Sequence, residues 1–590
     1  MNTAWDLSLL GFSESDIERE LEEVRTAHGT FIAGWKERGE WLEDPVNLCE
    51  ALDAYASLMG KYGYSGRVGY YYRLLYSLHQ GDAVVKGKLQ QVEEVERELQ
   101  SSLSFFYLGL SKVASEKQTL FLADSRLEKY RSFLANTFEW GKHTLSESEE
   151  KILTVTEGVR QDAWERMTAG LLSSQKRVIE IEGREEEKSF SELLNLCEDG
   201  EKELRDRAGA LVQEILDRYS GVGEAELNAV VLNKKISDEL RGFDRPDASR
   251  HLDDAVSTEM VDSLLEAVEK RFSIAQRYYA LKARLMGVSK LAYYERNCSY
   301  GSLPLYSFEE AARIVSTVFR SLDGEFGDIF DSFLRGKIDV FPYQGKRQGA
   351  FCTHNVKGQP VYILLNFEGT LRDATVLAHE VGHGIHAVLK LREQHGLAID
   401  TPKSTAEVAS TFFEDFVHRV LLDGVSDEMK LAILMDKVGG DVATIFRQVA
   451  FYRFEQALHS AIRKEGYISA ERIGVLFKEE MSRYMGEGVS VAEAGNWWLY
   501  VPHFRYFFYV YSYASGLLIS KALQEKVKAD PAFIQQFKAF LTAGSSLSPE
   551  QLFSGMGIDV SKEVTWNEGL DSVERAVDEC IVLAKKLRRI

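Results

Sequence analysis

The chain has 590 residues, of which 45% are hydrophobic and 27% charged, a balance that is typical of globular proteins and excludes a disordered chain. Its net charge of −20 opposes binding to nucleic acid and to anionic membranes. Five widely spaced cysteines without a CxxC pair exclude a disulfide framework and a cysteine-ligated zinc site. Because the sequence has no apolar run of membrane length and no signal-peptide pattern at its start, we expect a cytoplasmic protein.

Most of the chain has the composition of helices, since proline is scarce and Glu, Leu, Ala, Lys and Arg dominate. Helical periodicity with charged outer faces recurs in the ranges 14–28, 84–103, 123–160, 200–220 and 258–286. The third of these ranges is interrupted near Thr144 and Ser146, either of which could cap the helix that follows. The pattern changes between 336 and 370, where β-branched and aromatic residues alternate with turn glycines. There we predict three short strands, at 338–342, 350–354 and 361–366, before helices resume.

The next helix carries the strongest motif in the chain. Thr370 and Asp373 have the spacing of a capping box, which starts a helix. His379 and His383 are four residues apart on this helix, so they project from one face and can reach the same metal ion. Glu380 lies about 100° around the helix, where it can act as a general base without being a ligand. This HExxH pattern predicts a metallopeptidase site. The alternative, two surface histidines on an ordinary helix, conflicts with the apolar residues around them.

A catalytic zinc ion needs a third protein ligand, and two downstream glutamates are candidates. Glu407 and Glu414 are seven residues apart and therefore share a helix face. Ser404 and Glu407 also have capping-box spacing, so the spacing leaves metal ligation and capping as equal alternatives for Glu407. Glu414 is expected to orient a ligand histidine. His386 follows His383 by three residues but does not complete the HExxHxxGxxH pattern, so we expect it to support or pack rather than ligate.

These residues resemble a known family. HEVGHGIH at 379–386 and AEVASTFFE at 406–414 are similar to the thimet-oligopeptidase-like zinc metallopeptidases, and specifically to their oligoendopeptidase F branch. Further similar stretches are WDLS at 5–8, KHTLSESEEKIL at 142–153, GKRQGAFCT at 345–353, YILLNFEGTLRD at 362–373 and PHFRYFFYVYSYASG at 502–516. The resemblance implies a mainly α fold, a large helical two-lobed body with a deep central channel and a small β-sheet beside the HExxH helix. It also implies an N-terminal helical region at 1–115, a helical oligoendopeptidase F-type N-terminal domain at 116–200 and a zinc-peptidase catalytic domain at 201–590.

The resemblance further implies the roles of individual residues. One zinc ion per chain is expected on His379, His383 and Glu407. His503 and the tyrosines after it are expected to stabilise the negative charge that develops on the carbonyl oxygen during hydrolysis. Among those tyrosines we favour Tyr506 and Tyr513, which with the intervening Tyr509 are predicted to lie near one helical face. The alternative is an aromatic stripe in the core, and the gap between histidine and tyrosines is shorter here than in thimet-type members.

The function implied is that of a zinc-dependent endopeptidase that acts on short oligopeptides, as a monomer or small homo-oligomer. The strand 361–367 is expected at the lip of the channel, where an extended peptide can pair with its edge. Two alternatives stay open at this point. One is a metallocarboxypeptidase of related helical fold, and the other is a non-catalytic peptide-binding protein.

Overall fold

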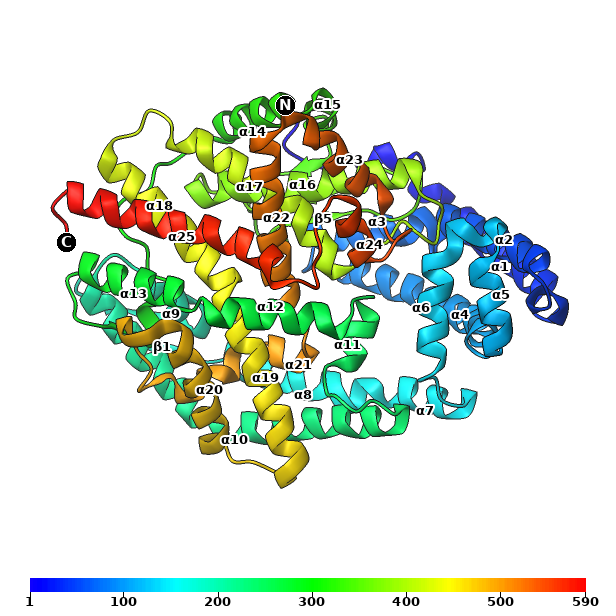
Figure 1. Cartoon of the computed structure of the whole chain (residues 1–590), viewed down its shortest axis with the longest axis horizontal. Coiled ribbons are helices and arrows are strands. Elements are labelled where there is room, and N and C mark those ends of the chain that lie inside the picture. The colour runs from blue at the N-terminus through cyan, green and yellow to red at the C-terminus, as the bar shows by residue number, and fades with distance from the viewer. The chain divides into compact units, whose positions relative to one another are not determined.

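The computed structural model describes all 590 residues, and coiled ribbons make up most of it (Figure 1). The mainly α class expected from the sequence is confirmed. The chain divides into two compact units, each assembled from three separate stretches. The first unit comprises Met1–Lys142, Pro304–Asp423 and Leu523–Asp559, and the second comprises His143–Leu303, Gly424–Ala522 and Val560–Ile590. The boundaries expected along the chain at 115 and 200 stay predictions.

The first unit is built from helices around one small sheet. Its N-terminal helices are α1 (Ile17–Trp35), α2 (Pro45–Tyr62), α3 (Gly66–Leu78), α4 (Ala83–Ser111), α5 (Ser115–Ala123) and α6 (Arg131–Gly141). Its later helices are α14 (Phe308–Leu322), α15 (Gly324–Phe333), α16 (Leu371–Glu393), α17 (Lys403–Leu422), α23 (Ile534–Ala543) and α24 (Pro549–Gly555). Its strands are β4 (Ile338–Asp339), β5 (Phe351–Thr353) and β6 (Tyr362–Leu364), which confirm the three strands predicted between 336 and 370.

The second unit contains longer helices and two minor sheets. Its first half holds α7 (Glu147–Glu157), α8 (Ala163–Ser173), α9 (Phe190–Leu196), α10 (Lys202–Arg241), α11 (Ala248–Asp253), α12 (Thr258–Lys270) and α13 (Ser273–Leu285). Its second half holds α18 (Asp427–Thr444), α19 (Phe446–Glu465), α20 (Ala470–Met485), α21 (His503–Tyr506) and α25 (Glu563–Lys586). The strands pair as β1 (Lys176–Ile181) with β2 (Arg184–Ser189), antiparallel, and β3 (Leu291–Ala292) with β7 (Val489–Ser490), parallel. Helix α22 (Tyr511–Ala529) begins in this unit and ends in the first.

Two predicted helix starts are confirmed by their caps. Ser146 caps α7 and forms a reciprocal capping box with Glu149. Thr370 caps α16 in the same way with Asp373, whose carboxylate accepts a hydrogen bond of 2.9 Å from the Thr370 N–H. These bonds satisfy N–H groups that the first turn of a helix otherwise leaves unpaired. No helix of the protein combines the length and the apolar character that crossing a membrane requires.

The three-stranded sheet has β6 at its centre. β4 pairs with β6 in parallel and β5 pairs with it antiparallel, which gives the order β4-β6-β5. The residues of β6 are completely buried, whereas those of β5 are half-buried. The expectation that the strand 361–367 offers its edge to a peptide is wrong, because neighbouring strands occupy both edges of β6. The outer strands of the sheet are β4 and β5. Beside β4 the N-terminal segment is already bonded, since the Val340 N–H donates to the carbonyl of Thr3.

The sheet packs between the N-terminal segment and α16. Trp5 covers one face, where its Nε1 donates a hydrogen bond of 2.7 Å to the carbonyl of Ile363 and its ring meets that of Tyr362 at 5.5 Å. Successive side chains of a strand point to opposite faces, so the Ile363 side chain points to the other face. There a Cβ on Gly384 of α16 would lie 3.3 Å from Ile363 Cδ1. The sheet therefore lies beside the HExxH helix, as expected.

The turn after α16 is held against α2 by two glycines. A Cβ on Gly396 would lie 2.1 Å from the carbonyl oxygen of Ala56 and 2.3 Å from the backbone nitrogen of Gly60. Both of these atoms belong to the backbone of α2, so neither can move aside as the end of a flexible side chain can. Only a glycine at 396 permits this approach.

Substituting Gly396 tests the importance of this contact. We expect Gly396→Ala to lower the free energy of unfolding by about 2–3 kcal/mol, because the new methyl group overpacks a backbone contact. The matched control is Gly29→Ala in α1, where a Cβ meets nothing within 4 Å and alanine gains about 0.5–1 kcal/mol of helix propensity. Thermal unfolding of both variants by scanning calorimetry measures the difference. Equal melting temperatures in the two variants would contradict the contact.

Candidate metal centre

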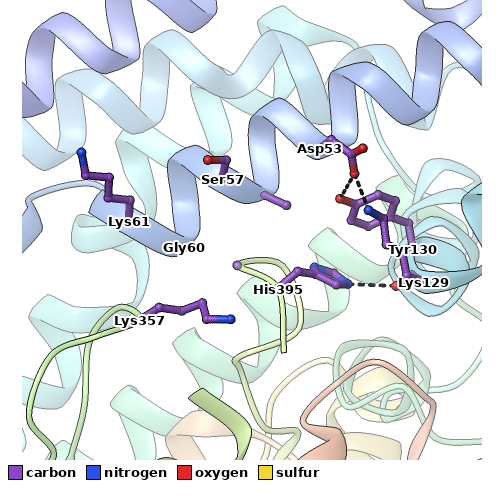
Figure 2. Close-up of a pocket in the computed structure, with 10 residues that line it drawn as sticks. Asp53, Ser57, Gly60, Lys61, Lys129, Tyr130, Lys357 and His395 are labelled. Atoms are coloured by element: carbon purple, nitrogen blue, oxygen red, sulfur yellow. Dashed lines mark hydrogen bonds and ion pairs between the residues drawn. The ribbon is translucent and has the colours of Figure 1, made fainter. Parts of the chain in front are cut away.

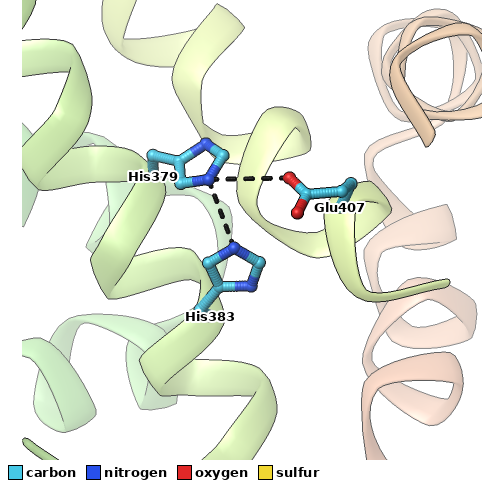
Figure 3. A group of neighbouring side chains, drawn as sticks. All are labelled: His379, His383 and Glu407. Carbon is cyan, nitrogen blue, oxygen red and sulfur yellow. Dashed lines mark hydrogen bonds and ion pairs between the residues drawn. The ribbon is translucent and has the colours of Figure 1, made fainter. Parts of the chain in front are cut away.

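Helix α16 carries the HExxH motif through the interior of the first unit. Its buried residues lie on all sides of the helix and include Leu377, Val381 and Ile385. His379 and His383 are only half-buried, and both project from the same side of α16 toward Glu407 (Figure 3). A helix buried on all sides does not fit the alternative of two surface histidines on an ordinary helix.

Helix α17 crosses α16 at a glycine. A Cβ on Gly382 would lie 2.8 Å from the Cα of Ser410 and 3.2 Å from the carbonyl oxygen of Ala409. A larger residue would push the two helices apart, since these atoms belong to the backbone of α17. The crossing brings two carboxylates of α17, those of Glu407 and Glu414, to His379 of α16.

Three side chains at this crossing offer donor atoms to one centre (Figure 3). The Nε2 atoms of His379 and His383 are 3.2 Å apart, and Glu407 Oε2 lies 3.6 Å from His379 Nε2. The three donor atoms all lie within 4.8 Å of one another. Tetrahedral zinc with bonds of about 2.0–2.1 Å holds its donor atoms about 3.3 Å apart, so this donor set fits one divalent ion.

The capping alternative for Glu407 is wrong. Helix α17 begins at Lys403 after Pro402, so Ser404 lies inside the first turn rather than at the cap. The buried Ser404 hydroxyl has no hydrogen-bond partner. Glu407 instead turns its carboxylate toward His379.

Glu414 contacts the other nitrogen of the same histidine. Its Oε1 accepts a hydrogen bond from His379 Nδ1. This bond places the ring proton on Nδ1 and leaves the lone pair of Nε2 directed at Glu407 and His383. The structure thus has the contact that orienting a ligand histidine requires.

The charges at the centre call for a cation. Burial lowers the pKa of His379, but the negative charges of Glu414, Glu407 and Glu380 outweigh it and raise that pKa to about 9. Burial raises the pKa of Glu407, and the charge of Glu414 adds to the effect. Burial together with the charge of His379 lowers the pKa of His383 well below its usual value. Three carboxylates near one imidazole repel each other, and a divalent ion relieves that repulsion.

Glu380 lies next to the edge strand and has a free oxygen. Its side chain is 7% exposed, and Oε2 has no hydrogen-bond partner in the protein. The backbone N–H of Cys352 in β5 donates to this carboxylate. Burial, opposed by the charge of His379, raises the pKa of Glu380 to about 7. A buried carboxylate oxygen without a partner is rare in native structures, and it suits a group that meets water or substrate.

His386 lies outside the donor cluster. It is buried one turn beyond His383, and its ring meets that of Phe540 at 6.1 Å. Burial and the charge of Lys390 lower its pKa well below the usual value, so the ring is neutral. The expectation that His386 packs rather than ligates agrees with this position.

The predicted aromatic residues lie in the second unit, and they do not share one helical face. Helix α21 ends at Tyr506, and α22 begins only at Tyr511. Phe507 and Phe508 between them have positive φ angles of 53° and 55°. The expectation of a continuous helical face is therefore wrong, because the chain reverses between Tyr506 and Tyr509.

The reversal brings His503 to Tyr509 rather than to Tyr506. His503 Nδ1 is hydrogen-bonded to the Tyr509 hydroxyl. Tyr513 is close to both rings, at 6.0 Å from His503 and 5.9 Å from Tyr509 between centroids. Tyr506 is 51% exposed, and its hydroxyl donates a bond of 2.5 Å to Glu165. Sequence spacing placed all three tyrosines near one helical face, because no local signal in the sequence indicates a turn at Phe507 and Phe508.

A pocket of about 490 Å³ lies elsewhere in the first unit, between α2 and the turn after α16 (Figure 2). Its charged groups are largely bonded to protein atoms. Asp53 pairs with Lys129 at 2.6 Å and accepts a bond of 2.6 Å from Tyr130, while Lys357 donates to the carbonyl of Gln394. None of its lining residues belongs to the donor cluster, so the pocket is no part of the candidate centre.

A mainly α fold in which an HExxH helix crosses a helix that supplies two carboxylates is the arrangement of a metallopeptidase. The chain belongs to Peptidase family M3, whose model matches residues 196–572, and a second model, described as Oligopeptidase F, matches residues 110–174. The chain is 23% identical to oligopeptidase PepF of Bacillus subtilis, over 94% of this chain and 83% of that protein. It is 25% identical to group B oligopeptidase PepB of Streptococcus agalactiae, over 82% and 81%. A solved structure of oligoendopeptidase-F from Enterococcus faecium has the same fold, with a TM-score of 0.71 and 18% identity over 98% of this chain and 100% of that one.

Removing the charge of Glu414 tests its support of His379. We expect Glu414→Gln to weaken the affinity for zinc about 10–100-fold, because the substitution keeps the shape but removes the charge that holds the Nδ1 proton. Competition with a chelator, followed by metal analysis, measures the affinity. The control is Glu393→Gln at the exposed end of the same helix. Equal affinities in the two variants would show that Glu414 does not act on the ligand.

Proposed function

We propose that this protein is a zinc-dependent endopeptidase that hydrolyses internal bonds of short peptides. The observation that carries the proposal is the cluster of His379, His383 and Glu407 with the partnerless Glu380 oxygen beside it. Membership of a peptidase family and similarity to oligopeptidases support it. We further propose one zinc ion per chain, a cytoplasmic location and a monomer or small homo-oligomer.

In the proposed mechanism His379, His383 and Glu407 would hold a zinc ion. Zinc, when bound, acts as a Lewis acid that polarises a water molecule and the scissile carbonyl. Glu380 removes a proton from that water as its oxygen attacks the carbonyl carbon. As the C–N bond breaks, Glu380 returns the proton to the nitrogen of the leaving amine. Glu414 keeps the proton of His379 on Nδ1 throughout.

We propose that the substrate binds along the free edge of β5. This strand lies beside Glu380 and has backbone groups that β6 does not pair. An extended peptide that adds to an edge strand is held by backbone hydrogen bonds, whatever its sequence. A channel of the kind that the family resemblance implies would limit such substrates to short peptides.

His503, Tyr506 and Tyr513 stay the proposed donors to the carbonyl oxygen, and Tyr509 joins them. Burial and the charge of Arg447 lower the pKa of His503 to about 4, so the ring is neutral at physiological pH. The hydrogen bond to Glu165, with burial, raises the pKa of Tyr506 to about 12, so its hydroxyl keeps its proton. To donate to a substrate carbonyl, this hydroxyl must first break its hydrogen bond to Glu165. This part of the proposal rests on the family resemblance and on the donor chemistry of these side chains.

The two alternatives are less well supported. A metallocarboxypeptidase needs a cation that receives the substrate's terminal carboxylate. Lys390 lies on the same face of α16 two turns beyond His383, but it is 3% exposed and its ammonium donates a bond of 2.5 Å to Thr401. A non-catalytic peptide carrier does not account for a buried Glu380 carboxylate whose Oε2 has no hydrogen-bond partner.

A blocked peptide distinguishes endopeptidase from carboxypeptidase. We expect an internally quenched peptide with an acetylated N-terminus and an amidated C-terminus to be cleaved, because an endopeptidase needs neither terminus. Treatment with a chelator should abolish cleavage, and stoichiometric zinc should restore it. Fluorescence and mass analysis of the products measure both. Cleavage of free-acid peptides alone would favour the carboxypeptidase.

Substitution of the general base separates chemistry from metal binding. We expect Glu380→Gln to retain zinc and the fold but to lose a factor of about 10²–10⁴ in kcat, since an amide cannot accept the proton. Metal analysis and steady-state kinetics on the blocked peptide check the two halves. The control is again Glu393→Gln, outside the centre on the same helix. A Glu380→Gln variant with undiminished kcat would rule out the general-base role.

A further inference from the structure

Two consecutive phenylalanines of the second unit are in a strained backbone conformation. Phe507 has φ 53° and ψ 120°, and Phe508 has φ 55°. Residues other than glycine avoid this region because their Cβ meets the backbone. Each such residue is destabilising and persists only where its surroundings hold it in place.

One buried side chain holds the strained turn from α19. Glu455 Oε1 accepts a hydrogen bond of 2.9 Å from the backbone N–H of Phe508. Both residues are completely buried. The rings of His459 and Tyr452, also on α19, pack against Phe508 at 4.6 Å and 5.4 Å. The turn is therefore fixed by one hydrogen bond and by close packing on the same helix.

Glu455 makes no other hydrogen bond. Its Oε2 is buried and has no partner. Burial raises the pKa of Glu455 to about 8, against the bond from the Phe508 N–H and the charge of Arg250, so the carboxyl group is mostly protonated at neutral pH. A buried carboxyl group costs stability wherever its polar atoms are left unsatisfied. In this position it satisfies one backbone donor at a turn where two consecutive residues are strained.

The segment before the turn is held separately. Arg505 is 3% exposed and pairs with Glu226 through two bonds of 3.0 and 2.7 Å. The same guanidinium donates to the carbonyl of Val501 at 2.8 Å and to that of Leu499 at 3.1 Å. Arg505 thus anchors α21, which carries His503. Glu455 anchors the residue immediately before Tyr509.

We propose that Glu455 is a positioning residue, which holds the Phe507–Phe508 turn and thereby brings the Tyr509 hydroxyl onto His503 Nδ1. The bond between these two groups orients the His503 ring. Without the anchor, the turn relaxes to an ordinary backbone conformation and Tyr509 leaves the histidine. The inference rests on the proposed function, in which His503 and the tyrosines donate to the substrate carbonyl.

Two substitutions at Glu455 give opposite expectations. Glu455→Ala removes the acceptor of the Phe508 N–H, and we expect kcat on the blocked peptide to fall about 10–100-fold with KM and zinc content unchanged. Glu455→Gln keeps an oxygen at the same place, and its amide is uncharged like the protonated carboxyl group. We therefore expect activity within about threefold of the unmodified protein. Wild-type kcat in Glu455→Ala would overturn the proposal. Equal losses in both variants would do the same.

A double-mutant cycle tests whether Glu455 acts through Tyr509. Tyr509→Phe removes the hydroxyl alone, and we expect the Glu455→Ala/Tyr509→Phe protein to be no slower than the slower single variant, because both changes break the same contact. Losses that multiply would overturn the proposal, since Glu455 would then act independently of Tyr509. Wild-type activity in Tyr509→Phe would overturn it as well.

A control of similar burial separates positioning from stability. Glu295 is 1% exposed, belongs to the same unit and pairs with Arg205 at 3.1 Å, away from the segment 503–513. We expect Glu295→Ala to lower the melting temperature but to leave kcat unchanged below it. A fall in kcat as large as that of Glu455→Ala would assign both effects to lost stability and overturn the proposal. Failure of the proposed function looks different, because undiminished turnover in Glu380→Gln or in chelator refutes it whatever Glu455 does.

Discussion

The close crossing of α16 and α17 at Gly382 is the contact on which the rest of the metal centre depends. Its backbone-to-backbone approach leaves no room for a Cβ. The crossing sets Glu407 against one nitrogen of His379 and Glu414 against the other. A displacement of α17 by even the width of a methyl group would separate both carboxylates from the histidine together. The positions of the candidate donor atoms and the orientation of His379 therefore both depend on this contact between the two helices.

Charge imposes a second constraint on the same place. Three carboxylates gather around one imidazole in a largely buried region, and burial together with their mutual repulsion raises the pKa of Glu380 to about 7. Without a cation this arrangement is costly. The centre keeps this electrostatically unfavourable arrangement because the capping box at Thr370 and the packing of Gly384 on the sheet hold α16 in position. Stability supplied by these ordinary contacts permits an electrostatically unfavourable centre.

The aromatic segment of the second unit follows a different rule. There the strain lies in the backbone, at Phe507 and Phe508, and the support comes from buried polar side chains rather than from helix crossing. Arg505 and Glu455 are buried ionisable side chains, and each forms a hydrogen bond to a backbone atom within a few residues of His503. In both units, the residues of functional interest are thus positioned by features that are unfavourable in isolation: a glycine inside a helix at 382, and positive φ angles at Phe507 and Phe508.

The sequence by itself determined whatever depends on local periodicity. The helical class, the three short strands and the shared face of His379 and His383 follow from the repeat of a helix or a strand, and the cap at Thr370 follows from capping-box spacing. Of Thr144 and Ser146, only the structure identifies Ser146 as the cap of α7. Tertiary structure decided the rest. Spacing could not separate ligation from capping at Glu407, because the answer lies in where α17 begins and what it crosses. It could not place β6 at the centre of the sheet, since strand order is set by pairing between distant segments. Nor could it show that the helix is interrupted between Tyr506 and Tyr509, because the turn at Phe507 and Phe508 packs against α19, where Glu455, more than fifty residues earlier, accepts the Phe508 N–H.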